Sequence, residues 1–278
     1  GGQMSKPIIR VTELQTWQEC KYRHQLNYRE RLHLMPSGEG GVSPQVSGSA
    51  IHFGIEAAML EQTGRNKVQV AQESAMLYLR TRGADERYAH GVETALQGVP
   101  AEVWQTVTPQ SEQRINVEYD RYIMSGQPDL WTYDENAIII TDFKSTSKDE
   151  GDRLSRYQLL NMQPRWYAVL LTAQFHVQKR EIPPIYTRHI ILSTRGKPVT
   201  GTPVLQTEAG LHQAARMMHS IAGEIAMSEA ISFQDATVSS SCDWCEFLDL
   251  CTMHLTGGDW QAILTEKYRR GHEGLSGS

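Results

Sequence analysis

The chain has 278 residues, of which 40% are hydrophobic and 21% are charged. This length suits one large domain or two modest ones with a sizeable apolar core. No stretch is apolar over the roughly 18 residues that a membrane span needs, so we expect a cytoplasmic protein with no membrane partner. The formal net charge of −5 argues against a protein that coats nucleic acid nonspecifically, but it is compatible with an enzyme that binds DNA in a local basic groove.

The N-terminal region, residues 5–110, has mainly the periodicity of helices. Leu14, Trp17 and Leu26 stand at helical intervals. A segment rich in glycine and proline predicts a loop over residues 36–48, and helical patterns resume beyond it.

From Gln113 the apolar residues follow the period of a β-strand. Three strands separated by turns are predicted over residues 115–124, 127–133 and 137–144. A long amphipathic helix and a fourth strand follow over residues 154–173 and 185–193.

The C-terminal region begins with a helix predicted over residues 207–228 and ends with a short helix near residues 260–268. The order of elements predicts the α+β class, with a small central mixed β-sheet flanked by helices. We expect a single domain built from three regions: residues 5–110, 111–206 and 207–278.

A charged pair ends the strand predicted over residues 137–144. Asp142 and Lys144 are two residues apart and project from the same face, while Phe143 points to the opposite face. Three consecutive isoleucines indicate a buried strand, where a charged pair is costly unless it is used or neutralised. Taken alone, such a short motif is more often a surface ion pair than a catalytic site.

Asp129 precedes this strand and supplies a second carboxylate. Carboxylates on neighbouring strands can share a hard divalent cation such as Mg²⁺ or Mn²⁺. The cation lowers the pKa of bound water, polarises a phosphate and offsets charge on the leaving oxygen. Lys144 can then position the hydroxide or stabilise the pentacovalent state, which is the chemistry of phosphodiester hydrolysis.

Four motifs follow one another along the chain. They are Gly48-Ser49-Ala50-Ile51-His52, Asp129 in the sequence GQPD, Asp142-Phe143-Lys144, and Gln163-Pro164-Arg165-Trp166-Tyr167. This series resembles the PD-(D/E)XK nuclease superfamily and, within it, the RecB-like nucleases. The resemblance implies a restriction-endonuclease-like αβααβ core and metal-dependent nuclease activity.

The resemblance also assigns roles to single residues. The implied catalytic residues are Asp129, Asp142, Lys144, Gln163 and Tyr167. His52 would be a neutral imidazole ligand that completes the metal site with the two aspartates, although a lone histidine on such a helix is more often packed in a core. Gln163 and Tyr167 would contact the substrate backbone or orient Lys144, and their alternative role is helix–sheet packing.

Two glutamates lie near these motifs. Glu56 follows His52 by one helical turn and could accept a hydrogen bond within the site, but a solvated helix face is the more common role. Glu118 is next to the site in sequence order, and such a residue lies outside the site more often than in it.

The four cysteines are Cys20, Cys242, Cys245 and Cys251. Disulfides are disfavoured in a reducing cytoplasm, so the C-x2-C-x5-C spacing indicates thiolates that converge on one metal centre. Some RecB-like nucleases, including the AddB subunit and CRISPR-associated exonucleases, carry one cysteine before the nuclease core and three after it. The resemblance implies that these four thiolates bind a [4Fe–4S] cluster that joins the N- and C-terminal helical regions.

Zinc is the alternative metal for the cysteines. His254 follows Cys251 by three residues and would complete a C-x2-C-x5-C-x2-H zinc site without Cys20. Cysteine and histidine spacing alone does not separate the two metals.

We expect a stand-alone, metal-dependent DNA exonuclease that prefers single strands or DNA ends. The sequence has no G-x-x-x-x-G-K-[ST] phosphate loop, so ATP-driven unwinding would need a partner. The resemblance implies a helicase, a recombinase or the CRISPR adaptation machinery as partners, in recombination, repair or phage DNA metabolism. The alternatives are a catalytically silent iron–sulfur subunit that binds DNA, and RNA as the substrate.

Aromatic and basic side chains can line the path of a nucleic-acid strand by stacking on bases and contacting phosphates. The candidates are Trp17, Arg23, Tyr157, Arg165 and Trp166.

Overall fold

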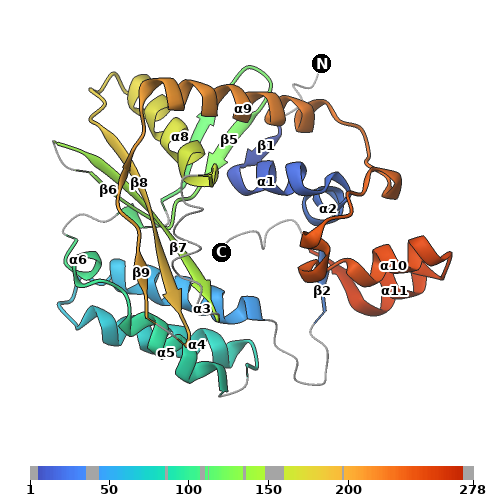
Figure 1. The fold of residues 1–278 in the computed structure, drawn as a ribbon, viewed down its shortest axis with the longest axis horizontal. Coiled ribbons are helices and arrows are strands. Elements are labelled where there is room, and N and C mark those ends of the chain that lie inside the picture. Colours follow the sequence, from blue (N-terminus) through green and yellow to red (C-terminus); the bar gives the residue numbers. More distant parts are fainter. Residues whose placement is uncertain are drawn as a thin grey trace. The chain divides into compact units, whose positions relative to one another are not determined.

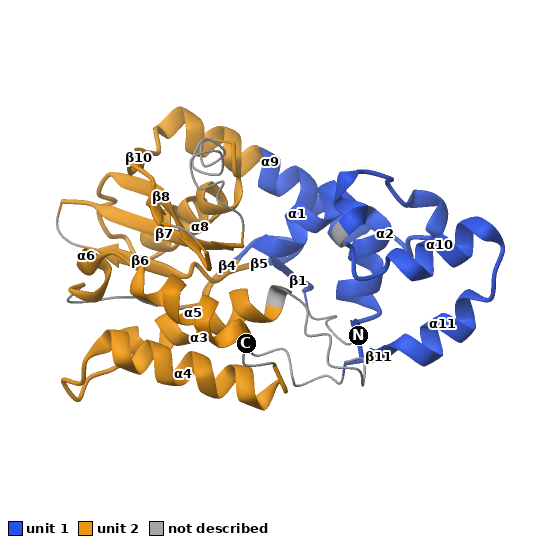
Figure 2. Ribbon diagram, turned by 60° about the horizontal axis from the view of Figure 1, so that its bottom comes forward, with its two compact units in different colours: residues 1–39, 118–124, 217–278 blue, residues 40–117, 125–216 orange. Residues whose placement is uncertain are grey.

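The computed structural model describes residues 6–35, 44–84, 87–106, 110–111, 113–133, 136–147, 160–195 and 197–271. The chain forms two compact units, which are coloured separately in Figure 2. Unit 1 comprises residues 1–39, 118–124 and 217–278, and unit 2 comprises residues 40–117 and 125–216. The expectation that the chain is a single domain built from residues 5–110, 111–206 and 207–278 stays a prediction.

Unit 2 contains a mixed β-sheet of strand order β10-β8-β7-β6-β3, in which β9 also pairs with β8. Its strands are β3 (Gln110–Ser111), β6 (Leu130–Tyr133), β7 (Ile138–Thr146), β8 (Ile185–Ser193), β9 (Val199–Thr200) and β10 (Val204–Leu205). Strands β7 and β8 run parallel, whereas the other pairs are antiparallel. The mixed α+β class predicted from the sequence is confirmed.

Helices cover both faces of this sheet (Figure 1). The helices of unit 2 are α3 (Pro44–Met59), α4 (Lys67–Thr81), α5 (Arg87–Gln97), α6 (Ala101–Trp104) and α8 (Gln163–Val177), and α4 packs against α3 and α5. Helices α3 and α5 pack against β7 and β8 from one side, and α8 packs against the same two strands from the other. The two central strands are therefore covered on both faces, which fits their run of apolar residues.

Strand β7 places neighbouring side chains on different faces. Phe143 is 1% exposed and packs in a core with Ile51 of α3 and with Ile190 and Leu192 of β8. Asp142 and Lys144 contact groups on the α8 side. The predicted separation of the charged pair from Phe143 is confirmed, and it follows from the two-residue period of a strand.

The strand predicted over residues 115–124 is wrong in its middle. The chain forms two strands there, β4 (Ile115–Glu118) and β5 (Ile123–Gly126), which neighbour each other in a second sheet of order β1-β5-β4. A turn joins them, in which the Tyr119 N–H donates to the Tyr122 carbonyl at 2.9 Å. The sequence did not predict this turn because its residues, Tyr119 to Tyr122, include no glycine or proline.

Two helix starts also differ from prediction, and both involve proline. Helix α3 begins at Pro44, within the predicted loop, and α8 begins at Gln163 with Pro164 in its first turn. A first-turn N–H has no partner within the helix, so proline loses nothing there. The earlier part of the helix predicted over residues 154–173 is not helical at residues 160–162, and residues 154–159 lie outside the described residues.

Unit 1 combines short elements from both ends of the chain. They are β1 (Ile8–Arg10), α1 (Val11–Glu19), α2 (Lys21–His24), the π-helix η1 (Gln25–Arg29), β2 (Leu32–Leu34), the 3₁₀ turns η2 (Phe233–Asp235) and η3 (Ser240–Trp244), α10 (Leu248–Thr256), α11 (Trp260–Lys267) and β11 (Tyr268–Arg270). Helix α9 (Glu208–Met227) contributes residues to both units. Strands β2 and β11 pair antiparallel beside a small core formed by Tyr22, Leu26, Leu32, Phe247, Leu250 and Tyr268. Every helix in the described part of the chain is too short or too polar to cross a membrane.

Truncation of Phe143 tests the hydrophobic core that packs against β7. We expect Phe143→Ala to lower the free energy of unfolding by about 3–5 kcal/mol, because a buried ring is replaced by a cavity. The matched control is Phe53→Ala on α3, where the ring is 39% exposed and the loss should be clearly smaller. Urea unfolding followed by circular dichroism measures both, and equal losses would contradict this assignment of the core.

Candidate active site

The middle of β7 carries an ion pair between a buried carboxylate and a partly exposed ammonium group. Asp142 is 2% exposed, and Lys144 Nζ lies 3.1 Å from its Oδ1 and 2.9 Å from its Oδ2. Burial by itself lowers the pKa of Lys144, but the carboxylates of Asp142 and Asp129 outweigh burial and raise it above its ordinary value. Lys144 therefore remains an ammonium group that donates hydrogen bonds and supplies positive charge.

Helix α8 fixes the orientation of the lysine. Lys144 Nζ donates to Gln163 Oε1 at 3.4 Å, and Gln163 Nε2 donates to Tyr167 Oη at 2.9 Å, one turn along the helix. Because Tyr167 engages the amide nitrogen of Gln163, the amide oxygen is directed towards the ammonium group. Tyr167 is 3% exposed, so its buried ring serves packing and its hydroxyl orients Gln163.

His52 and Asp129 form a second pair. His52 Nδ1 of α3 lies 3.3 Å from Asp129 Oδ1, and Asp129 Oδ2 accepts the Phe143 N–H at 2.7 Å. This backbone hydrogen bond ties Asp129, just before β6, to the neighbouring strand β7. Burial lowers the pKa of His52, but the carboxylates of Asp129 and Asp142 outweigh burial and raise it above its ordinary value.

Two glycines lie where α3 and α8 approach the strands. A Cβ at Gly126 would lie 2.7 Å from Leu170 Cδ1 and 3.0 Å from Tyr167 Cδ1, and both side chains are buried. A Cβ at Gly48 would lie 2.8 Å from Ser145 Oγ, on the exposed end of β7. Glycine in GQPD thus lets α8 pack closely against buried side chains, whereas glycine in G-x-x-x-H avoids only a contact with the rotatable Ser145 hydroxyl.

His189 was missed in the sequence analysis. It lies on β8 directly beside Asp142 in the parallel register, is 4% exposed, and places Nε2 3.2 Å from Asp142 Oδ2. Burial raises the pKa of Asp142, but the contacts with His189 and Lys144 outweigh burial and lower it below its ordinary value. The available signal was a titratable residue directly before the apolar run Ile190-Ile191-Leu192 of the strand predicted over residues 185–193.

Other candidate residues have different surroundings. Glu118 pairs with Lys6 at 2.8 Å, and its side chain is 68% exposed, which is a surface ion pair. Glu56 is partly buried on α3, and burial raises its pKa. Trp166 and Trp17 are buried in their units, so the prediction that they stack on nucleotide bases is wrong.

The remaining strand-path candidates are two arginines and a tyrosine. Arg23 pairs with Glu19 at 3.2 Å, and Arg165 is partly buried at the start of α8. Tyr157 lies outside the described residues. The role of these three residues in contacting a nucleic-acid strand therefore stays a prediction.

The active-site residues fit a hard divalent cation by chemistry. Among the described residues, no group of three or more His, Cys, Asp or Glu side chains is arranged to hold a metal ion. The contact of 3.3 Å between His52 Nδ1 and Asp129 Oδ1 is nevertheless close to the separation of about 3 Å between adjacent ligands of an octahedral ion. Asp142 Oδ2 lies 2.9 Å from Lys144 Nζ and 3.2 Å from His189 Nε2, so a cation bound by this carboxylate would share it with both nitrogen groups.

The four cysteines all belong to unit 1. Cys20, Cys245 and Cys251 border the small core of that unit, and all four thiols are partly buried. Burial and the neighbouring thiols of Cys245, Cys20 and Cys242 raise the pKa of Cys251 to about 11. Backbone N–H groups face two of the sulfurs: Arg23 N lies 3.4 Å from Cys20 Sγ, and Ser239 N lies 3.5 Å from Cys242 Sγ. Among the described residues the cysteines do not form a group of three or more that could hold a metal ion, so thiolate donors fit a sulfur-ligated centre by their chemistry alone.

His254, the alternative zinc ligand, is held between aromatic rings. Its imidazole stacks on Phe233 at 4.7 Å and on Trp260 at 4.6 Å between ring centroids. Its Nε2 also lies 3.4 Å from Tyr22 Oη. These contacts indicate that the His254 imidazole packs among the aromatic side chains of unit 1.

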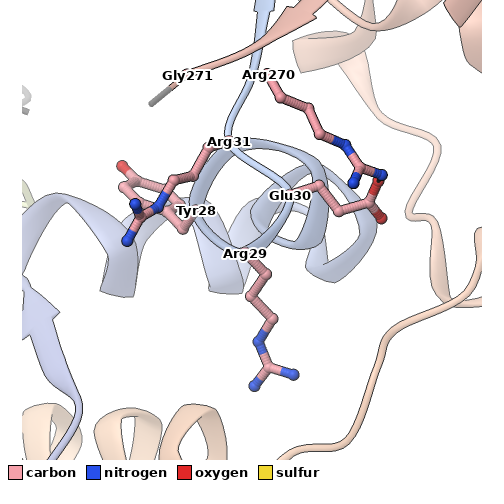
Figure 3. Close-up of a pocket in the computed structure, with 6 residues that line it drawn as sticks. All are labelled: Tyr28, Arg29, Glu30, Arg31, Arg270 and Gly271. Carbon is pink, nitrogen blue, oxygen red and sulfur yellow. Dashed lines mark ion pairs between the residues drawn. The ribbon is translucent and has the colours of Figure 1, made fainter. Parts of the chain in front are cut away.

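A shallow hollow of about 370 Å³ in unit 1 is lined by Tyr28, Arg29, Glu30, Arg31, Arg270 and Gly271 (Figure 3). The three guanidinium groups point in different directions. Arg29 donates to the carbonyls of Ile225 and Glu229 at the end of α9, and Arg270 lies 3.9 Å from Glu30. The positive charges around the hollow therefore do not converge on one position where an anionic ligand could bind.

The family model of the PD-(D/E)XK nuclease superfamily matches residues 10–252. The chain belongs to this superfamily. It is similar to a provisionally named exonuclease from Eubacterium rectale, with a TM-score of 0.50, 14% identity and coverage of 93% of this chain and 100% of that one. It is also similar to the protein SSO0001, with a TM-score of 0.37, 16% identity and coverage of 90% and 88%. No curated protein matches the sequence.

Substitution of Gly126 tests the close approach of α8. We expect Gly126→Ala to destabilise the protein by about 1–3 kcal/mol, because the new methyl group overlaps buried side chains. Leu170→Ala alone should cost about 2–5 kcal/mol, and the double variant should cost less than the sum, since it removes the overlapping atom.

Gly223→Ala on α9 is the matched control, because a Cβ there meets nothing within 4 Å. It should stabilise the protein by about 0.5–1 kcal/mol through helix propensity. Thermal and urea unfolding measure all four variants. Additive losses at positions 126 and 170 would contradict the packing described for α8.

Proposed function

We propose that the chain is a Mg²⁺- or Mn²⁺-dependent DNA exonuclease of the RecB-like branch, acting on single strands or DNA ends. The proposal rests chiefly on the contact network of Asp142, Lys144, Gln163 and Tyr167, to which the His52–Asp129 pair is added. Membership of a nuclease superfamily supports hydrolysis of nucleic acid. The DNA substrate, the exonucleolytic mode and the pathway are parts of the proposal.

His52, Asp129 and Asp142 would hold the divalent cation. When bound, the cation supplies Lewis acidity and lowers the pKa of a water molecule. Asp129 keeps one carboxylate orientation because the Phe143 N–H engages its Oδ2 and His52 contacts its Oδ1. The chain thus presents carboxylate and imidazole donors from α3, β7 and the segment before β6.

Lys144 acts through its positive charge. Its raised pKa makes it a poor general base, whereas its ammonium group can donate to a phosphate oxygen as negative charge develops. Gln163 accepts from Nζ and holds it near Asp142, which limits the number of orientations that the flexible lysine can adopt. This restriction lowers the entropy that must be lost when substrate binds.

We also propose a [4Fe–4S] cluster bound by Cys20, Cys242, Cys245 and Cys251. Three of these cysteines, Cys20, Cys245 and Cys251, border the same small core of unit 1, and a zinc site with His254 would leave Cys20 without a role. Stacking of His254 between Phe233 and Trp260 favours the cluster over zinc. A cluster joining distant parts of the chain would stabilise unit 1 by restricting the unfolded chain.

The alternative function is a catalytically silent iron–sulfur subunit that binds DNA. The buried carboxylate of Asp142 argues against it, because burying a charged group costs free energy that an inactive fold could avoid. Partners such as a helicase, a recombinase or the CRISPR adaptation machinery, and a cytoplasmic location, remain expectations from the sequence.

Cleavage of labelled single-stranded DNA in the presence of Mn²⁺ tests the activity. Asp142→Asn should lower the rate at least about 100-fold, because it removes a charged ligand from the site. Asp120→Asn is the matched control at an exposed position and should keep the wild-type rate.

Substrates labelled at the 5′ or the 3′ end give the polarity of digestion, and a matched RNA competitor tests the sugar preference. Equal rates for Asp142→Asn and wild type would exclude the enzymatic function.

Visible absorption of protein purified without oxygen tests the cluster. We expect broad charge-transfer absorption together with iron and acid-labile sulfide, and Cys20→Ala should lose all three. A colourless protein that contains zinc, and that keeps its zinc in Cys20→Ala, would favour the alternative site with His254.

A further inference from the structure

A histidine from β8 completes the surroundings of the buried carboxylate. The side chain of His189 is 5% exposed, and its Nε2 lies 3.2 Å from Asp142 Oδ2. Lys144 contacts the same carboxylate, with its closest approach of 2.9 Å also at Oδ2. Asp142 is therefore in contact with two nitrogen groups, one from its own strand and one from the neighbouring strand.

Asn161 links this histidine to α8. Its Nδ2 lies 3.1 Å from His189 Nε2, and its Oδ1 accepts the Gln163 N–H at 3.0 Å, where α8 begins. The same Gln163 accepts from Lys144 through its side chain. His189 Nε2 carries either one hydrogen or one lone pair, so it can donate to Asp142 or accept from Asn161 Nδ2, but it cannot do both at once.

We propose that His189 is a positioning residue for the Asp142 carboxylate, fixing the orientation in which Asp142 binds the catalytic cation. This inference rests on the proposed nuclease function. A carboxylate on a strand can rotate about its side-chain bonds, and a ligand that must be oriented at the moment of binding loses affinity for the ion. Donation from His189 Nε2 removes this freedom by tying the carboxylate to the neighbouring strand β8.

The role differs from packing alone in one respect. A purely structural histidine could be replaced by an apolar side chain of similar size with no effect on cation affinity, provided that the fold is kept. A positioning histidine requires a polar nitrogen near Oδ2, which glutamine can supply in part and leucine cannot.

Mn²⁺ binding in the absence of DNA provides a readout independent of activity. Binding can be followed by electron paramagnetic resonance or calorimetry on the full chain. We expect His189→Leu to weaken Mn²⁺ binding by about 10–100-fold and His189→Gln to recover part of the loss. His176→Gln, at an exposed position of α8, is the matched control and should bind as wild type.

Steady-state cleavage of single-stranded DNA at saturating Mn²⁺ adds a second readout. His189→Leu should lower kcat while leaving the KM for DNA near the wild-type value, because the histidine acts through Asp142 and not on the substrate. Urea unfolding without metal verifies that each variant is folded. If His189→Leu does not fold, the comparison of His189→Gln with His189→Asn decides, since only the longer amide should retain Mn²⁺ affinity.

The results separate this inference from the proposed function. Loss of Mn²⁺ binding in Asp142→Asn together with wild-type binding in folded His189→Leu would overturn the role of His189 and leave the metal site intact. Equal Mn²⁺ binding by Asp142→Asn and wild type would instead remove the proposed metal site. Equal loss in the leucine and glutamine variants would also overturn the positioning role.

Discussion

The carboxylate of Asp142, buried in the middle of the parallel strands β7 and β8, constrains the arrangement of the groups around it in unit 2. Asp142 is 2% exposed, and an isolated ionised carboxylate at such a position would cost several kcal/mol. Lys144 and His189 stand within 3.2 Å of it and offset this cost. The position of these groups depends on the register of β7 and β8, because a shift by one residue would send His189 to the opposite face.

The surrounding helices complete the site by approaching the sheet closely. On one face α3 brings His52 to Asp129, and on the other α8 brings Gln163 to Lys144. Gly126 permits the second approach, since any larger residue would meet Leu170 and Tyr167. The network is thus held by packing as well as by polar contacts, and both limit the orientations that its side chains can adopt.

Superfamily membership and the geometry of the site supply different parts of the functional argument. The family match over residues 10–252 establishes a nuclease superfamily, whereas structural similarity at 14% identity concerns the fold alone. The proposed chemistry therefore depends on this chain's own side chains. The ammonium group of Lys144, fixed between Asp142 and Gln163, supports phosphate chemistry more directly than any overall likeness.

The sequence by itself determined the mixed α+β class, the main helices and the opposite orientations of Asp142 and Phe143, because these follow from local periodicity. Motif order was also sufficient to select His52, Asp129, Lys144 and Gln163 as a candidate site. Only the tertiary structure placed His189 beside Asp142 and His254 between two aromatic rings. Those neighbours come from segments far apart in the chain, and strand register and ring stacking are set by packing that local sequence patterns do not encode.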